Sequence, residues 1–254
     1  MSGFAKALAI DAALAVAKIA RLRAVPILMY HSLDDESSGL SVPVSHFRDQ
    51  MAWLRDHGGR TVTLDEYADA LNGPGLGGLG RAVVVTFDDG YVNNFEHALP
   101  VLERHGFTAT LFIATGCVGE MTPWLEHDWP VMTWDQIRTC REAGHSIGAH
   151  TVTHPHLSEL PRDEARREMA ESKDTLEERL GEEVRWLCYP FGSFTPETEA
   201  IAREVGFRGA VSVNEGLRNR PEDLFRLRRV YIGPETDLRH FAFAMTRFHG
   251  WRHG

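Results

Sequence analysis

The chain has 254 residues, of which 43% are hydrophobic and 25% charged, and this profile excludes wholesale disorder and fibrous repeats. Its 36 acidic and 27 basic residues give a net charge of −9 with histidine neutral, which disfavours nucleic acid as a binding partner. Cys117, Cys140 and Cys188 are too widely spaced for a disulfide framework, and we interpret them as buried or semi-buried free thiols in a reducing compartment. Thirteen histidines are many for this length and prompt a search for a metal site.

The N-terminal segment Phe4–Ala20 is rich in alanine and is interrupted by charged residues. Its apolar runs are too short for a secretory signal, and a membrane span needs ~20 apolar residues. We therefore interpret residues 1–24 as an Ala-rich helix that packs on the domain or makes an oligomer contact, the oligomeric state itself being left open. The expected location is cytoplasmic, and peripheral association with a membrane surface is the less favoured alternative.

Short apolar runs alternate with amphipathic segments along nearly the whole chain. The β-branched run Ala82–Phe87 is typical of a parallel strand buried on both faces. The pattern predicts strands at Val25–Tyr30, Ala82–Phe87, Thr108–Ile113, Ser146–Ala149, Trp186–Tyr189, Ala210–Val213 and Arg229–Ile232. It predicts one helix capped by Ser45 and others at Asp65–Leu71, Asn94–His105, Trp134–Ala143, Arg162–Leu180, Pro196–Val205 and Leu238–Arg247.

Alternation of strand and helix produces βα units around a parallel sheet, so the fold class is α/β. Seven or eight such units in one domain suggest a closed, irregular (β/α) barrel over residues 25–254. The segment Gly75–Gly80 formally matches G-x-G-x-x-G, but a loop leads into a strand there, whereas dinucleotide binding needs a strand followed by a helix. We interpret it as a surface loop, and the charges of Arg162–Leu180 as a solvated helix face.

Two adjacent carboxylates follow the buried strand in the motif Thr86-Phe87-Asp88-Asp89-Gly90. Barrel enzymes place their chemistry at this end of the strands, and paired buried carboxylates need a cation or a shared proton. Alternation points the two side chains in different directions, so one can hold a metal while the other moves a proton. A helix cap or an Asp-Gly turn explains the pair equally well when it is taken alone.

Two histidines four residues apart, His150 and His154, follow the strand Ser146–Ala149 at the same end of the expected barrel. They can converge on one ion if the chain turns between them, and imidazole with carboxylate is a ligand set for zinc or a similar divalent metal. A turn with exposed histidines is the alternative. The co-occurrence of Asp-Asp and His-x-x-x-His at strand ends weakens that alternative.

Five segments in order make a specific resemblance: ILMYHS at 27–32, TFDDG at 86–90, GHSIGAH at 144–150 continuing into the two-histidine motif, and LCYPFGS at 187–193. Together they resemble the polysaccharide deacetylases of carbohydrate esterase family 4, which carry the NodB homology domain. The similarity spans roughly residues 25–232. It implies an irregular (β/α) barrel and a metal-dependent N-deacetylase.

The resemblance also implies residue roles. It makes Asp89, His150 and His154 the metal ligands and Asp88 the general base that activates water. The motif Tyr189-Pro190-Phe191 matches the family's oxyanion site, which implies that the backbone N–H of Phe191 holds the oxyanion. The implied cofactor is a divalent metal, Zn²⁺ first, with Co²⁺ or Ni²⁺ as alternatives.

Two positions depart from the family pattern. Many members have an arginine where this chain has Cys188, and a late Leu-x-His segment that supplies the general acid is missing. Arg229 is the candidate replacement for the arginine as partner of Asp88, against the alternative of a surface residue. The N-terminal segment that ends at His31 resembles the missing late segment. This circularly permuted arrangement is similar to the poly-N-acetylglucosamine deacetylase subgroup, and it implies that His31 is the general acid. The alternative is a histidine that merely ends a strand.

Other candidates suit sugar binding or structure. Aromatic and polar residues in the loop 115–132 would stack on sugar faces beside the barrel mouth or form a structural lid; they are Trp124, His127, Asp128 and Trp129. We expect His145 to be structural, and His156 to lie exposed or behind the metal ligands.

The sequence thus predicts a hydrolase that removes N-acetyl groups from N-acetylhexosamine units of a glycan or glycan precursor. One alternative is an allantoinase-like cyclic amide hydrolase, since that group shares the barrel. The other is an inactive barrel that only binds glycan, although its signature would be loss of the aspartate or histidine pair, and both pairs are intact.

Overall fold

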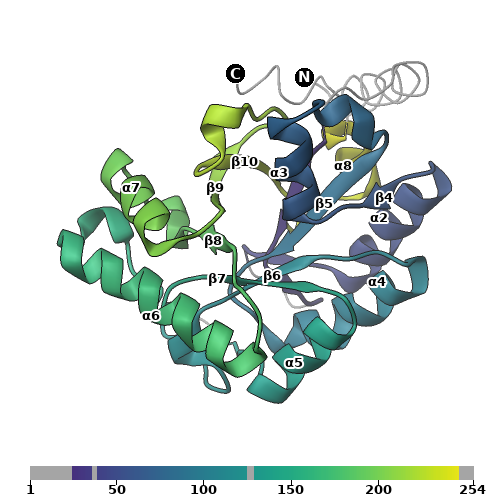
Figure 1. Cartoon of the computed structure of the whole chain (residues 1–254). Helices are drawn as coiled ribbons and strands as arrows, with labels where there is room; N and C mark the ends of the chain where they lie inside the picture. Colours follow the sequence, from purple (N-terminus) through teal and green to yellow (C-terminus); the bar gives the residue numbers. More distant parts are fainter. Residues whose placement is uncertain (1–24, 36–38, 125–128, 246–254) are drawn as a thin grey trace.

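The computed structural model describes residues 25–35, 39–124 and 129–245, so the helix expected at residues 1–24 lies outside the described chain. Seven parallel strands close into a barrel in the order β1-β5-β6-β7-β8-β9-β10, with β10 pairing back onto β1 (Figure 1). They are β1 (Ile27–Tyr30), β5 (Ala82–Phe87), β6 (Thr110–Ile113), β7 (Ser146–Ala149), β8 (Trp186–Cys188), β9 (Gly209–Glu215) and β10 (Leu227–Tyr231). The predicted irregular (β/α) barrel is confirmed, with seven strands in the closed ring.

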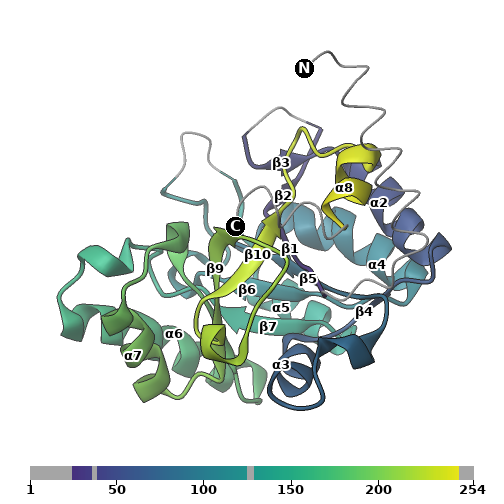
Figure 2. The ribbon, with the colours of Figure 1, turned by 90° about the horizontal axis from the view of Figure 1, so that it is seen from above.

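Helices cover the outside of the barrel, with α2, α4 and α8 on one side and α5, α6 and α7 on the other (Figures 1 and 2). Their bounds are α2 (Val44–Asp56), α3 (Leu64–Asn72), α4 (Leu99–His105), α5 (Trp134–Glu142), α6 (Arg162–Leu180), α7 (Pro196–Val205) and α8 (Leu238–Ala244). The short strand β4 (Arg60–Thr61) pairs with β5 outside the ring, and β2 (Ser32–Leu33) pairs with β3 (Ser41–Val42).

The barrel has two apolar layers, which the period-two alternation of each strand separates. On β5, Val83, Val85 and Phe87 belong to the large core cluster shared with the covering helices, whereas Ala82 and Val84 belong to a second cluster with residues of the other strands. Every second residue after Ala82 and Val84 points to the same side of the strand, and the next two such residues are Thr86 and Asp88. The first aspartate of the Asp-Asp pair is therefore directed into the barrel mouth by the same alternation that builds the core.

The predicted elements differ from the observed ones mainly at their ends. Ser45 does not cap α2, because that helix already begins at Val44 after Pro43, whose fixed φ suits a helix entry. The helix expected at Asn94–His105 opens with a π-helical turn over Asn94–Ala98 before α4. The segment expected as one loop at 115–132 opens with a short 3₁₀ turn over Thr115–Cys117.

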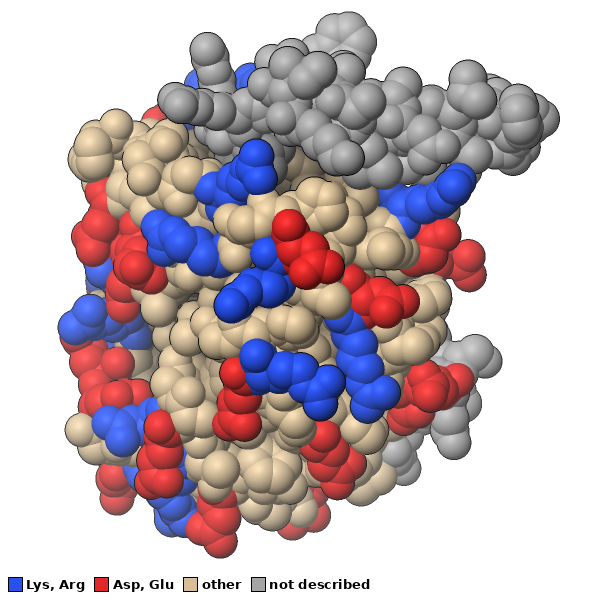
Figure 3. Space-filling view, turned by 90° about the vertical axis from the view of Figure 1, so that its right-hand side faces the viewer, with Lys and Arg blue, Asp and Glu red and all other residues tan. Residues whose placement is uncertain are grey.

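The three cysteines are free and buried, as the sequence predicted. The G-x-G-x-x-G segment is a loop with one 3₁₀ turn that leads into β5, so it lacks the strand-then-helix setting of a dinucleotide site. Within the described ranges, no helix has both the length and the apolar character needed to cross a bilayer. On the face that carries α2 and α4, acidic and basic side chains are interspersed (Figure 3).

Candidate active site

A cavity of about 340 Å³ opens at the carboxyl ends of the strands. Its lining includes His31 after β1, the aspartate pair after β5, the two histidines after β7, Phe191 after β8, and Tyr231 of β10. The barrel thus brings together residues from five strands that are far apart in the sequence. The volume lies within the range of small-molecule sites.

Three potential metal ligands converge on the floor of this cavity. The Nε2 atoms of His150 and His154 lie 3.4 Å and 3.2 Å from Oδ1 of Asp89, and 3.1 Å from each other. All three side chains are at least nine-tenths buried. A tetrahedral site with bonds of about 2.0–2.2 Å would place neighbouring ligand atoms roughly 3.3–3.5 Å apart. The separations fit one small divalent cation.

Further contacts orient these ligands. His150 Nδ1 lies 2.8 Å from the carbonyl oxygen of Cys188, a contact that orients the ring with Nε2 toward Asp89. The Tyr91 hydroxyl donates a 2.6 Å hydrogen bond to Oδ2 of Asp89, the oxygen that does not face the histidines. Burial would raise the pKa of Asp89, but the bonds from the two histidines hold it well below its usual range. The carboxylate therefore stays ionised.

The first aspartate has a different partner. Arg229 donates two 2.7 Å hydrogen bonds to Asp88, one to each carboxylate oxygen, and its side chain is fully buried. Arg229 is itself oriented by the carbonyl of Ser212 at 2.9 Å and the hydroxyl of Thr86 at 3.0 Å. Burial would raise the pKa of Asp88, yet the Arg229 charge and hydrogen bonds lower it. This arrangement keeps a buried carboxylate ionised and fixed in orientation.

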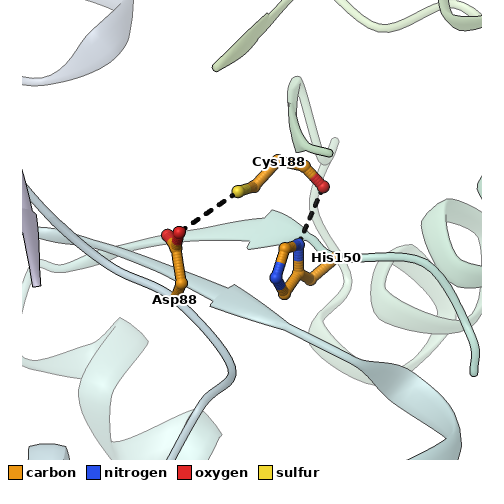
Figure 4. A group of neighbouring side chains, drawn as sticks. All are labelled: Asp88, His150 and Cys188. Atoms are coloured by element: carbon orange, nitrogen blue, oxygen red, sulfur yellow. Dashed lines mark hydrogen bonds between the residues drawn. The ribbon is translucent and has the colours of Figure 1, made fainter. Parts of the chain in front are cut away.

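A second group of potential ligands lies beside the first, formed by Asp88, His150 and Cys188 (Figure 4). The Cys188 thiol is 3.4 Å from Oδ2 of Asp88 and 3.3 Å from Nη2 of Arg229. Burial raises the pKa of that thiol, so it stays protonated and donates to the carboxylate. A guanidinium already bound to both Asp88 oxygens repels a metal ion here. The cluster around Asp89 is the better cation site.

His31 follows β1 and lines the cavity beside Asp88. Its Nε2 lies 3.8 Å from Oδ2 of Asp88, and its side chain is 13% exposed. The Tyr231 ring packs edge-on against the imidazole, with centroids 6.1 Å apart. The permuted N-terminal segment thus brings an imidazole into the same cavity as the aspartate pair.

Strained backbone is concentrated at the site. The non-glycine residues with positive φ in the described chain are Asp89, Thr151, His154 and Phe191, and three of them are proposed site residues. Phe191 adopts φ 55° in the turn after β8, where Gly192 and Ser193 donate the turn's hydrogen bonds to Tyr189 and Pro190. Such strain costs about 1–3 kcal/mol per residue and persists where the surrounding structure enforces it.

Aromatic side chains surround the second histidine. The Trp124 ring stacks on His154 with centroids 4.0 Å apart, and Phe191 contacts it edge-on at 4.5 Å. The exposed His156 stacks on Phe191, which lines the cavity, so His156 lies outside the group of potential metal ligands. His127 and Asp128, two other candidates from this loop, lie outside the described residues.

The remaining candidates have structural contacts. Trp129 packs edge-on against Tyr91, and His145 is buried with Nδ1 accepting the backbone N–H of Ala109. Tyr91 itself was missed by the sequence reasoning, although it follows Asp89 by two residues. Its position directly after the Asp-Asp-Gly motif was the available signal.

Comparison with known proteins places the chain in a family. A family model described as polysaccharide deacetylase matches residues 78–210. YxkH of Bacillus subtilis (strain 168), whose name marks it as a candidate polysaccharide deacetylase, is 32% identical over 210 residues, covering 83% of this chain and 72% of that protein. A poly-beta-1,6-N-acetyl-D-glucosamine N-deacetylase of Staphylococcus aureus (strain N315) is 24% identical over 200 residues, covering 74% of this chain and 66% of that protein.

Solved structures of deacetylases share the fold of this chain. The Streptococcus pyogenes deacetylase PplD, solved in complex with acetate, superposes with a TM-score of 0.78 at 28% identity, over 87% of this chain and 98% of that chain. IcaB from Ammonifex degensii superposes with a TM-score of 0.77 at 30% identity, and the match covers 88% of this chain and 98% of that chain. With the matched motifs and the shared barrel, these similarities show that the chain belongs to the polysaccharide deacetylase family.

Proposed function

We propose that this protein is a metal-dependent N-deacetylase that releases acetate from N-acetylhexosamine units of a polysaccharide, an oligosaccharide or a glycan precursor. The observation that carries the proposal is the pairing of two differently held aspartates in one cavity. Asp89 faces two histidines, and Asp88 is held by Arg229. One carboxylate is thus arranged for a cation and its neighbour for a proton.

The proposed cofactor is one divalent cation held by Asp89, His150 and His154, with Zn²⁺ preferred by the two imidazoles and one carboxylate, and Co²⁺ or Ni²⁺ as alternatives. When bound, such a cation lowers the pKa of water and polarises a carbonyl oxygen. The fit rests on ligand atoms that all lie within 4.8 Å of one another.

The proposed proton transfers use two further side chains. Asp88, kept ionised by Arg229, accepts the proton of the attacking water. His31, whose Nε2 lies 3.8 Å from Asp88, donates a proton to the nitrogen that leaves. Arg229 contacts Asp88 rather than the reacting atoms, so its role is positioning. Each proton transfer of this kind contributes typically 10²–10⁴-fold to a rate.

The oxyanion that forms on the acetyl carbon needs a hydrogen-bond donor, and we propose the backbone N–H of Phe191. Phe191 lines the cavity in the left-handed conformation that the turn after β8 imposes. The aromatic and apolar lining of the cavity, which includes Trp124 and Tyr231, suits the apolar faces of a sugar ring.

The substrate class comes from the relatives. One similar protein is named for deacetylation of poly-beta-1,6-N-acetyl-D-glucosamine, and a structural neighbour was solved with acetate, the expected product. The test is acetate release from N-acetylglucosamine oligomers by protein depleted of metal and then reloaded with Zn²⁺ or Co²⁺. Metal-dependent release supports the proposal. A protein that binds metal stoichiometrically but releases no acetate from any N-acetylated glycan contradicts it.

A further inference from the structure

The loop between the two histidines connects β7 to the segment before α6. It carries both imidazoles of the proposed cation site, and two of its residues, Thr151 and His154, have φ of 66° and 59°. Both values lie in the left-handed region, which is unfavourable for residues with a Cβ. Within the loop, the backbone N–H of His154 donates a 3.1 Å hydrogen bond to the Thr151 hydroxyl, and contacts from outside the loop add to it.

One carboxylate supplies most of those contacts. Glu168, on α6, accepts 2.9 Å hydrogen bonds on Oε2 from the backbone N–H groups of Val152 and Thr153. Its Oε1 accepts a 2.8 Å hydrogen bond from the Thr153 hydroxyl. Consecutive N–H groups that point at one anion form the concave arrangement known from anion-binding backbone turns. Here a side chain of the protein itself occupies that position.

The other side of the loop is held by a different element. Thr115 and Gly116, in the 3₁₀ turn Thr115–Cys117, donate backbone hydrogen bonds of 3.1 Å and 2.9 Å to the carbonyls of Thr151 and Val152. A Cβ at Gly116 would lie 2.7 Å from the Val152 carbonyl oxygen, so the two segments are in close contact. The peptide groups between the histidines are thus fixed from both sides.

The two imidazoles depend on this loop to different degrees. His150 has its own orienting partner, because its Nδ1 lies 2.8 Å from the Cys188 carbonyl. His154 Nδ1 is buried and has no hydrogen-bond partner among the described residues. Stacking on Trp124 restrains the ring plane of His154 but specifies no hydrogen-bond direction. The position of His154 Nε2 is therefore set mainly by the loop backbone, which Glu168 holds.

We infer that Glu168 is a positioning residue for the cation site: it fixes the backbone of residues 152 and 153 and so places the His154 imidazole for coordination. The inference rests on the proposed metal-dependent function. Residues that orient metal ligands from behind typically change metal affinity 10–100-fold when they are removed. Glu168→Ala should therefore weaken Zn²⁺ binding by about 10–100-fold.

The experiment measures Zn²⁺ affinity by competition with a chromophoric chelator, without any substrate. The matched control is Glu171→Ala, which removes an exposed glutamate less than one turn further along the same helix. We expect this control to keep wild-type affinity. Thr153→Val removes only the hydroxyl contact and Glu168→Gln keeps one acceptor oxygen, so both should lie between wild type and Glu168→Ala. These two variants also carry the test if Glu168→Ala does not fold.

The absorption spectrum of the Co²⁺-loaded proteins is the second measurement, because it reports ligand geometry. Glu168→Ala should change this spectrum, and saturating metal should restore much of its acetate release. Zn²⁺ affinity within twofold of wild type together with an unchanged Co²⁺ spectrum would overturn the inference. A wild-type protein that binds Zn²⁺ but releases no acetate would instead contradict the proposed deacetylation, and the affinity comparison would still decide the role of Glu168.

Discussion

Arg229 and Asp88 are 141 residues apart, yet the arginine donates two 2.7 Å hydrogen bonds to the carboxylate inside the barrel. Arg229 comes from β10 and Asp88 follows β5, and β1 lies between these strands in the ring. The two side chains therefore meet in the interior of the barrel, where Arg229 is fully buried. Cys188 lies against both of them, and its small side chain leaves space for the guanidinium.

Breaking this pair should destabilise the fold. Arg229→Met leaves the Asp88 charge buried without its partner, and such changes cost about 3–5 kcal/mol. The double variant Asp88→Asn/Arg229→Met leaves no buried charge at this position and should recover part of that loss. Chemical unfolding of both variants and of wild type measures this. Equal stability of the single and double variants would contradict a direct coupling between the two charges.

The same pair predicts a change in the pH dependence of activity. A carboxylate base works when it is ionised, so activity is lost as the pH falls through the pKa of Asp88. Arg229 lowers that pKa. An Arg229→Lys variant keeps the charge but not the bidentate hydrogen bonding. As the pH is lowered, its activity should therefore fall off at a higher pH than that of wild type. A pH–rate profile with an unmoved acidic limb would count against Asp88 as the base.

His31 should matter only for leaving groups that need a proton. His31→Ala should lower acetate release from N-acetylglucosamine oligomers by about 10²–10⁴-fold. Hydrolysis of 4-nitrophenyl acetate should change much less, because the nitrophenolate leaves without protonation. Parallel kinetics on the two substrates measure the difference. An equal loss on both would indicate that His31 binds substrate or supports the site instead of donating a proton.

Metal binding should stabilise the folded chain. Tyr91 should strengthen metal binding through its hydrogen bond to Asp89. At a Zn²⁺ concentration 100 times the Kd, the expected gain is about 2.7 kcal/mol, which a chelator removes. Tyr91→Phe deletes the 2.6 Å hydrogen bond to Asp89 and should weaken Zn²⁺ binding by about tenfold. Thermal unfolding at graded Zn²⁺ concentrations tests both. A Tm that does not depend on Zn²⁺ in wild type would contradict the cation site.

Close packing of Gly148 in the barrel interior predicts how a substitution there changes stability. A Cβ at Gly148, on β7, would lie 2.5 Å from two carbons of the buried Phe112 ring. Gly148→Ala should therefore cost about 1–3 kcal/mol through overpacking. Gly77→Ala is the matched control, since a Cβ there meets nothing within 4 Å. Comparable stability of the two variants would show that the barrel interior is looser than these distances indicate.

Most of the barrel could be predicted from the sequence because its strands are short apolar runs separated by helices with clear ends. Ala82–Phe87 matches β5 residue for residue, and Arg162–Leu180 matches α6. The N-terminus of α2 was missed because Ser45 looked like a cap, whereas the helix already begins at Val44, directly after Pro43. The π-helical turn before α4 has no distinct sequence pattern.

The site was less predictable where it depends on long-range contacts. The proposed ligand cluster could be predicted because its two motifs follow β5 and β7, parallel strands of one barrel whose carboxyl ends lie on the same side. Glu168 could not, because its helix shows only a charged pattern, and contact with Val152 and Thr153 depends on how α6 packs below the loop. The sequence suggested Arg229 only through the missing arginine at Cys188, and the register of β10 brings it to Asp88.

The most direct test of the proposed chemistry compares wild type with Asp88→Asn, both loaded with Zn²⁺, on N-acetylglucosamine oligomers. The substitution keeps the size of the side chain and leaves the proposed ligands Asp89, His150 and His154 in place. Asp88→Asn should bind Zn²⁺ as wild type does and release acetate at least about 10²-fold more slowly. Metal-dependent acetate release that survives the substitution at the wild-type rate would contradict the account of Asp88 as the base.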